Sequence, residues 1–508
     1  MNIGQAKEEI KNTVRAYLAK DEEGEYVIPV IRQRPVLLIG PPGIGKTAIM
    51  QQIARECGVG LVAYTITHHT RQSAIGLPFI EKRSYGGKEY SVTEYTMSEI
   101  VASIYDKIEL TGLTEGILFI DEINCVSETL APTMLQFLQG KTFGNHRIPD
   151  GWIIVSAGNP PEYNQSVREF DIVTLDRVKK IVVDADFSVW KTYAYEAGIH
   201  GAVISYLDIK KENFYQIETT VDGQEIVTAR GWEDLSKLIQ TYEALDIPVQ
   251  ESLIIQYIQN RRIAKDFANY FDLYKKYQTD YNVDEVLAGK IKASSIDRIK
   301  KASFDEKLSV ISLLISRLSS SFAQAYASDL YVHDLFDVLK EIKFLLMQPQ
   351  AQSSTVLAEK IAQIEDDIRL GKEKGQYEEG KVKSLRHVIR TLEADRQQIL
   401  KEGISSGDAA FELIRTNFAK DTAMRQQLIA EGKDKLANAF AFMETAFGES
   451  QEMVIFITEI NANTYCTRFI RDNGSEAYDR YNQALLFDKK RQTLLRDIDD
   501  VAELARLL

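Results

Sequence analysis

The stretch VLLIGPPGIGKTAIMQQIARE (residues 36–56) determines the expected fold. Its first four residues are apolar and predict a buried strand, and its last nine predict a helix. Between them, GPPGIGKT matches the pattern G-x-x-x-x-G-K-[ST]. In that pattern, backbone amides of a glycine-rich loop and of a helix N-terminus surround phosphate groups. The flanking strand and helix therefore favour a phosphate site over an ordinary glycine-rich turn.

This loop assigns roles to two side chains. Lys46 would reach the β- and γ-phosphates of a nucleotide, and the Thr47 hydroxyl would ligate Mg²⁺. The expected cofactors are ATP and Mg²⁺. The residues expected to bind the nucleotide through this loop are Gly40, Pro41, Pro42, Gly43, Ile44, Gly45, Lys46, Thr47 and Ala48.

Two further apolar runs end in polar residues that complete a candidate site. The run ILFIDE (117–122) ends in Asp121 and Glu122, whose side chains face different ways because side chains alternate along a strand. Asp121 would hold Mg²⁺ and Glu122 would orient and polarise the attacking water. A second run, WIIVSAGNP, ends at Asn159, which either bridges the γ-phosphate and that water or only caps the Asn-Pro turn.

Short apolar runs alternate with helical stretches from Pro35 to about Val183, which predicts a parallel sheet covered by helices. The expected strands are Val36–Ile39, Leu61–Thr65, Ile117–Ile120, Ile153–Ser156 and Ile181–Val183. We therefore expect an α/β nucleotide-binding domain at 1–186, a helical lid at 187–278, and an α-helical extension at 279–508. The lid should contain one β-hairpin around Val221–Gly223.

The extension contains the clearest helical pattern. Leu357, Ile361, Ile364 and Ile368 repeat at helical spacing, as do Leu385, Ile389 and Leu392, on either side of a glycine-punctuated turn. This pattern predicts a helical hairpin at 355–403, either free-standing or lying on a globular body. The run Met453–Thr458 is the one stretch of the extension that resembles a strand.

Composition limits the other possibilities. Net charge is −13, which opposes binding to a nucleic-acid backbone unless basic residues cluster. Three widely spaced cysteines suit a reducing cytoplasm. No run approaches the roughly 18 apolar residues of a membrane span, and the N-terminus has no secretory pattern. A cytoplasmic location without membrane insertion is expected.

Taken together, these motifs resemble the AAA+ ATPases, and more narrowly their MoxR-like and dynein-related branch, which carries an insert in helix 2. GPPGIGKT resembles Walker A, FIDEIN (119–124) Walker B, AGNPP (157–161) sensor 1, TLDRV (174–178) the arginine-finger segment, and TARGW (228–232) sensor 2. The likeness covers roughly residues 30–245. It implies a P-loop core and a homo-oligomeric ring, usually a hexamer, with ATP between subunits.

The resemblance implies roles for two arginines. Arg177 would act as the arginine finger on the neighbouring subunit's nucleotide, with Arg168 as the competing candidate. Arg230 would contact the γ-phosphate in its own or an adjacent subunit. The usual small-Pro-Arg sequence is Thr-Ala-Arg here.

The resemblance also implies a function. Residues 76–96 are placed where the helix-2 insert forms a hairpin, and residues 137–152 resemble the hairpin before sensor 1. The expected activity is ATP-driven, chaperone-like remodelling of a protein client, often a separate protein with a von Willebrand factor A domain. The alternative is a nucleic-acid-translocating subunit, for example of a restriction or defence system.

Overall fold

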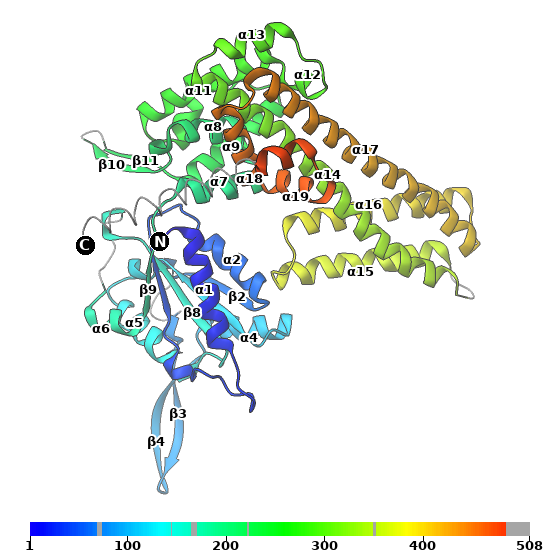
Figure 1. Cartoon of the computed structure of the whole chain (residues 1–508). Coiled ribbons are helices and arrows are strands. Elements are labelled where there is room, and N and C mark those ends of the chain that lie inside the picture. Colours follow the sequence, from blue (N-terminus) through cyan, green and yellow to red (C-terminus); the bar gives the residue numbers. More distant parts are fainter. Residues whose placement is uncertain (69–73, 144, 164–169, 221–222, 349–351, 484–508) are drawn as a thin grey trace, which may run out of the picture. The chain divides into compact units, whose positions relative to one another are not determined.

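The computed structural model describes the chain except residues 69–73, 144, 164–169, 221–222, 349–351 and 484–508. Its internal contacts divide it into two compact units (Figure 1). Unit 1 consists of Met1–Val189, Thr228–Arg230 and Ala362–Val382. Unit 2 consists of Trp190–Val227, Gly231–Ile361 and Lys383–Leu508. The predicted division at residues 186 and 278 stays a prediction.

Unit 1 is built on a five-stranded parallel sheet with the strand order β2–β5–β8–β1–β9. Every predicted strand is present, so the predicted α/β core is confirmed. Because the strands are parallel, the carboxyl ends of β1, β5 and β8 lie side by side at one edge. The strands are β1 (Val36–Ile39), β2 (Gly60–Thr65), β5 (Gly116–Asp121), β8 (Trp152–Gly158) and β9 (Lys179–Val182).

Helices cover both faces of this sheet. Successive residues of β1 and β5 enter opposite core clusters: Leu37 and Leu118 pack on one face, and Leu38 and Ile117 on the other. This two-sided burial explains why the strands are uninterrupted apolar runs. The cluster of Leu38 includes residues of α1 (Ile3–Leu18) and α2 (Lys46–Cys57). The cluster of Leu37 includes residues of α4 (Glu99–Thr111) and α5 (Ala131–Gly140).

Two β-hairpins extend from this unit, as the sequence predicts. The longer one pairs β3 (Pro78–Tyr85) with β4 (Lys88–Tyr95), and the shorter one pairs β6 (Thr142–Phe143) with β7 (His146–Arg147). A contact between His146 Nε2 and the Tyr95 carbonyl, 3.0 Å long, links the two hairpins. The short hairpin is anchored by stacking of Phe137 on Phe143, with ring centroids 3.8 Å apart.

Unit 2 is mostly helical. The predicted hairpin around residue 222 is present as β10 (Gln216–Thr220) and β11 (Gly223–Val227). The helices before α14 are α7 (Phe187–Glu196), α8 (Gly201–Ile209), α9 (Ala229–Ala244), α10 (Glu251–Tyr257), α11 (Arg261–Tyr281), α12 (Val283–Leu287) and α13 (Ala293–Lys301). They are followed by α14 (Phe304–Leu346), α15 (Ser353–Glu373), α16 (Glu379–Glu402), α17 (Gly407–Phe447), α18 (Gln451–Ala462) and α19 (Thr464–Asn473). Within α15 and α16, residues Ala362–Val382 belong to unit 1.

Helices α15 and α16 confirm the predicted helical hairpin, although Ile361 and Ile389 of its predicted apolar side are only half-buried. Leu385 and Leu392 are buried as predicted, but Val388 is fully buried in place of the half-buried Ile389. The same helix, α16, contacts α14, where His387 stacks on Tyr331 with ring centroids 3.9 Å apart.

The interpretation of Met453–Thr458 as a strand is wrong, because this run lies inside helix α18. Its buried residues are Met453, Phe456, Ile457 and Ile460, which repeat at three- and four-residue spacing. Packing of this face against α14, α17 and α19 therefore overrides the strand preference of its β-branched residues.

Helix α14 is long and apolar enough to cross a membrane by length and composition alone, and 56% of its most apolar window is buried within the protein. Within unit 2 it packs against α8, α11, α17, α18 and α19. These contacts bury many of its apolar residues in the core of this unit, as in the core helix of a globular protein.

Candidate active site

The phosphate loop joins the carboxyl end of β1 to α2, whose first residue is Lys46. Gly43 and Gly45 have φ angles of +75° and +94°, a backbone conformation that side chains other than glycine rarely adopt. A Cβ at Gly43 would lie 3.1 Å from the Thr228 Cβ, which is closer than ordinary contact. The loop therefore needs these glycines both for its turn and for its close approach to the segment at Thr228–Arg230.

Lys46 is the most deeply buried charged group at this edge of the sheet, with 7% exposure. Its Nζ donates to the carbonyl oxygens of Gly40 and Pro41 at 2.8 and 2.9 Å, and to Asn159 Oδ1 at 2.9 Å. Burial lowers the pKa of Lys46 to about 8, with Arg230 adding to the shift and Asp121 and Glu122 opposing it. The ammonium is thus surrounded by neutral oxygens, which favours the approach of an anion.

Thr47 and Asp121 come together from α2 and β5. The Thr47 hydroxyl donates to Asp121 Oδ2 at 2.8 Å, and Asp121 Oδ1 accepts from the Glu122 amide at 2.9 Å. Hydroxyl and carboxylate oxygens are the hard ligands that Mg²⁺ takes in phosphate sites.

Glu122 has an unusual backbone conformation. Its φ and ψ are 57° and 34°, in the left-handed region, immediately after β5 ends. Its carboxylate accepts from the Thr67 hydroxyl at 3.1 Å. The left-handed turn gives Glu122 a direction different from that of Asp121, as their separate predicted roles require. A strained residue of this kind is typical of functional sites.

Asn159 lies at the end of β8, where its side-chain oxygen accepts the hydrogen bond from Lys46. Its carbonyl accepts from Asn124 Nδ2 at 2.7 Å. Asn124 is 4% exposed and lies so close to Gly158 that a Cβ there would approach its Oδ1 to 2.4 Å. A role as a cap of the Asn-Pro turn, the alternative for Asn159, does not explain its hydrogen bond to Lys46.

Sequence reasoning gave no role to Thr67 or Asn124, although both contact predicted site residues. Thr67 follows the end of β2, and Asn124 lies three residues after Asp121. Polar residues just beyond strands that share one carboxyl edge are the signal that could have identified them.

The arginines are placed differently from one another. Arg230, in the first turn of α9, has its Cβ 3.6 Å from the position of a Cβ on Gly43, so it lies beside the phosphate loop of its own chain. Arg177 is exposed at the end of α6 (Ile172–Arg177), where its guanidinium donates to Gln139 Oε1 of α5. Arg168 lies outside the described residues.

The residues present fit a bound magnesium–nucleotide. A glycine cradle, the N-terminus of α2 and a buried lysine without a carboxylate on its ammonium favour a polyphosphate. Thr47 and Asp121 supply oxygen ligands for the metal ion. Of the predicted site residues that the structure describes, Arg177 alone lies away from this edge.

These features are those of a P-loop ATPase domain, and the comparison with protein families agrees. Residues 36–174 match the family described as ATPase family associated with various cellular activities (AAA), so the chain contains an AAA ATPase domain. The solved structure of a lysine-to-arginine mutant of Thermotoga maritima RuvB is 16% identical, with a TM-score of 0.27, over 59% of this chain and 75% of that chain. No curated protein matches the chain.

Proposed function

We propose that this chain is a cytoplasmic subunit of a MoxR-like, ATP-hydrolysing ring motor that remodels a protein partner. The proposed ATPase activity rests on one observation. At one edge of the sheet lie, close together, Lys46, Thr47, Asp121, Glu122 and Asn159. Lys46 and Thr47 lie at the start of α2, and the other three residues lie at the ends of the neighbouring strands β5 and β8.

The proposed catalytic roles follow from these contacts. Lys46 and the loop amides would bind the phosphates, and Thr47 with Asp121 would hold Mg²⁺. Magnesium-bound ATP supplies the phosphoanhydride bond that is cleaved. Glu122 orients the attacking water and accepts its proton, with Thr67 fixing the carboxylate. Asn159 connects the phosphate end of the site to Lys46.

A ring would complete this site. Arg177 is exposed, and its guanidinium contacts a neutral amide, so it is available to a nucleotide held by an adjacent subunit. Arg230, beside the phosphate loop, would report nucleotide state within its own subunit and move the lid (187–278) against the core. A hexamer is the expected assembly of such domains.

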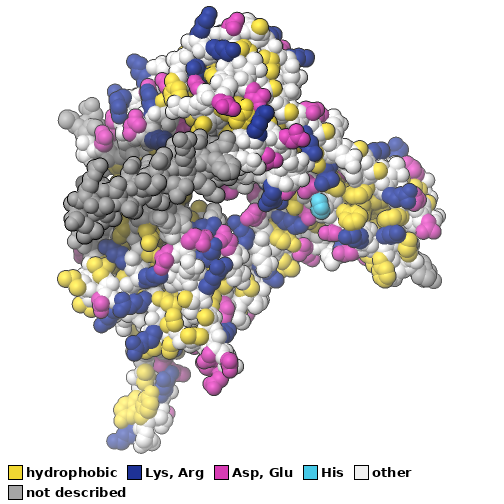
Figure 2. All heavy atoms as spheres, in the orientation of Figure 1, with side chains coloured by type: hydrophobic (Ala, Val, Ile, Leu, Met, Phe, Trp, Pro, Cys, Tyr) yellow, Lys and Arg dark blue, Asp and Glu magenta, His cyan; other side chains and the backbone are white. Residues whose placement is uncertain are grey.

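The exposed hairpin β3–β4 supports a protein client over a nucleic acid. Several of its apolar side chains are exposed, among them Ile80 at 76% and Tyr90 at 50%, and Figure 2 shows hydrophobic side chains along this projection. Its three cations, Lys82, Arg83 and Lys88, are balanced by three glutamates, and Arg83 pairs with Glu81 and Glu94. A phosphate backbone would need an excess of cations. A separate von Willebrand factor A domain protein is the proposed kind of client.

Affinity capture with Glu122→Gln tests the function. This variant should keep ATP bound and retain the client in native lysate, whereas Lys46→Ala combined with Glu122→Gln, which cannot hold the nucleotide, should not. Within the Glu122→Gln background, Ile80→Ser with Tyr90→Ser should release the client. The matched pair Tyr105→Ser with Leu110→Ser, exposed on α4, should not. Recovery of nucleic acid in place of protein would overturn the proposed client.

A further inference from the structure

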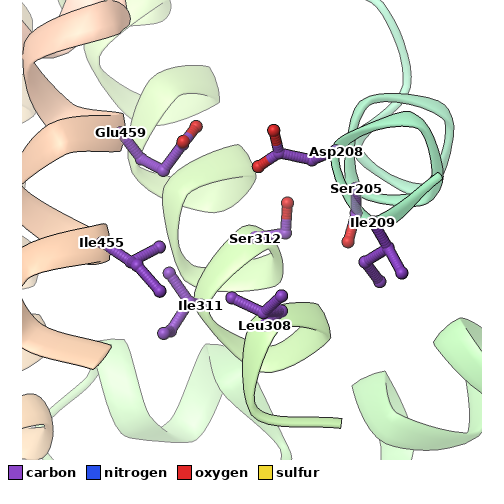
Figure 3. A pocket seen from close by; sticks show the side chains of 8 residues that line it. All are labelled: Ser205, Asp208, Ile209, Leu308, Ile311, Ser312, Ile455 and Glu459. Carbon is purple, nitrogen blue, oxygen red and sulfur yellow. The ribbon is translucent and has the colours of Figure 1, made fainter. Parts of the chain in front are cut away.

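Unit 2 contains a pocket of about 330 Å³ between the end of α8 and the first turns of α11. Its size is at the lower end of the range for small-molecule sites. By contrast, the cavity of Figure 3, between α8, α14 and α18, holds about 10 Å³, room for one water at most. The polar residues that line the larger pocket are Lys210, Asn213, Arg262, Lys265, Asp266 and Asn269.

Asn213 carries the strongest indication of a ligand. It is 4% exposed, and its Oδ1 has no hydrogen-bond partner in the described part of the chain. The orientation of the amide is fixed, because Tyr206 donates its hydroxyl to Asp266 at 2.8 Å and accepts from Asn213 Nδ2 at 2.7 Å. The orphaned oxygen therefore needs a donor, and leaving such a group unpaired is costly.

The charge of the pocket indicates the rest of the ligand. Lys210 pairs with Asp266, whereas Arg262 and Lys265 are exposed and form no ion pair with any described residue. Both lie in the first two turns of α11, where the helix dipole also favours negative charge. The pocket thus combines an excess of two positive charges with one buried acceptor.

We propose that this pocket binds a small phosphate monoester that also carries a hydroxyl group. Arg262 and Lys265 would bind the phosphate by charge-assisted hydrogen bonds, and the hydroxyl would donate to Asn213 Oδ1. A small molecule fits better than a polymer, because the acceptor is buried inside a pocket and not spread along a surface. This site is separate from the proposed ATPase residues and does not depend on their role.

Titration calorimetry with glycerol 3-phosphate tests the proposal on the full chain, with saturating Mg²⁺ and ADP filling the phosphate loop. Saturable binding is expected, and Arg262→Gln with Lys265→Gln should weaken it by at least about tenfold. The matched pair Arg261→Gln with Lys211→Gln removes the same charge from exposed neighbours that do not line the pocket, and should bind as the native chain does.

A second ligand isolates the role of Asn213. Propyl phosphate, which lacks the hydroxyl groups, should bind about fivefold more weakly than glycerol 3-phosphate to the native chain. Lys46→Ala should bind glycerol 3-phosphate normally, which separates this site from the ATPase. Absence of saturable binding, equal affinity for the two ligands, or an equal loss in the control pair would overturn the proposal.

Discussion

The phosphate loop of unit 1 and the junction of α7, α8 and α18 in unit 2 each bury one lysine, but they surround it differently. Lys46 and Lys191 are 7% and 8% exposed. Lys191 contacts two carboxylates, Asp208 at 2.8 Å and Glu459 at 2.6 Å, and Figure 3 shows these carboxylates facing each other from α8 and α18. Among the described residues, Lys46 Nζ contacts neutral oxygens alone.

This difference distinguishes a lysine that is suited to bind an anionic ligand from a lysine that stabilises the fold. A buried ammonium between two carboxylates is satisfied by the fold and holds three helices together. A buried ammonium among carbonyl and amide oxygens has hydrogen bonds but no compensating charge, so the fold bears an electrostatic cost that an anionic ligand can remove. The same comparison predicts which substitutions affect activity and which affect stability.

The largest effect is expected for Lys46→Met. Steady-state ATP hydrolysis should fall at least about 1000-fold in kcat/KM, because a preorganised cation on the transferred phosphoryl group is lost. The free energy of unfolding of the nucleotide-free protein, measured by urea denaturation, should not fall. A variant that hydrolyses ATP normally would break the comparison, as would one that is strongly destabilised without nucleotide.

Arg177→Ala extends the comparison to an exposed cation with a neutral partner. Its kcat should fall about 1000-fold, because the finger stabilises charge only in the transition state. Nucleotide affinity, measured with a fluorescent ATP analogue, should be unchanged. Lys180→Ala, an exposed control nearby, should be fully active. Normal turnover in Arg177→Ala would mean that Arg168, and not Arg177, is the arginine finger.

Lys191→Met should have the opposite profile. Its loss leaves Asp208 and Glu459 unpaired, and the free energy of unfolding should fall by about 3 kcal/mol, while ATP turnover per folded molecule is unchanged. Adding Glu459→Gln should restore part of the loss. Lys237→Met removes an exposed lysine that pairs with the half-buried Glu233, and should cost under about 0.5 kcal/mol. Equal stability of Lys191→Met and the native chain would contradict the structural role.

The sequence predicts more of unit 1 than of unit 2 for a physical reason. In unit 1, residues such as Lys46 and Asp121 follow short apolar strands, and parallel strands bring their ends together without long-range information. Thr67 was missed because its role depends on the side chain of Glu122, which it contacts across β2 and β5.

In unit 2 the important contacts join helices that are distant in sequence. Lys191 and Glu459 are separated by 268 positions, and nothing in their local sequence indicates the pair. Helical periodicity identified α15 and α16, but it did not identify Val388, which is fully buried while Ile389 is half-buried. The β-branched residues of Met453–Thr458 suggested a strand, but this run lies in α18, and the helical spacing of its buried residues was the better guide.

The smallest expected effect extends the comparison to a buried acid. Asp395 on α16 is 4% exposed and accepts from Asn417 Nδ2 at 2.8 Å. Burial raises its pKa from 3.8 to about 6, with Asp421 adding to the shift and Lys420 opposing it. The folded state therefore binds more protons than the unfolded state between pH 4 and 6, and the stability that Asp395 contributes is lost as pH rises through 6.

Asp395→Asn removes this pH dependence while keeping an acceptor for Asn417. At pH 7 the variant should unfold with a free energy higher by up to about 2 kcal/mol, and this advantage should vanish near pH 4, where the native carboxyl is protonated. Urea denaturation across this range measures the difference. Asp434→Asn, exposed on α17, should show no such change. An advantage that is constant with pH would mean that the Asp395 carboxylate is already compensated, as Lys191 is, and that burial alone does not identify a costly charge.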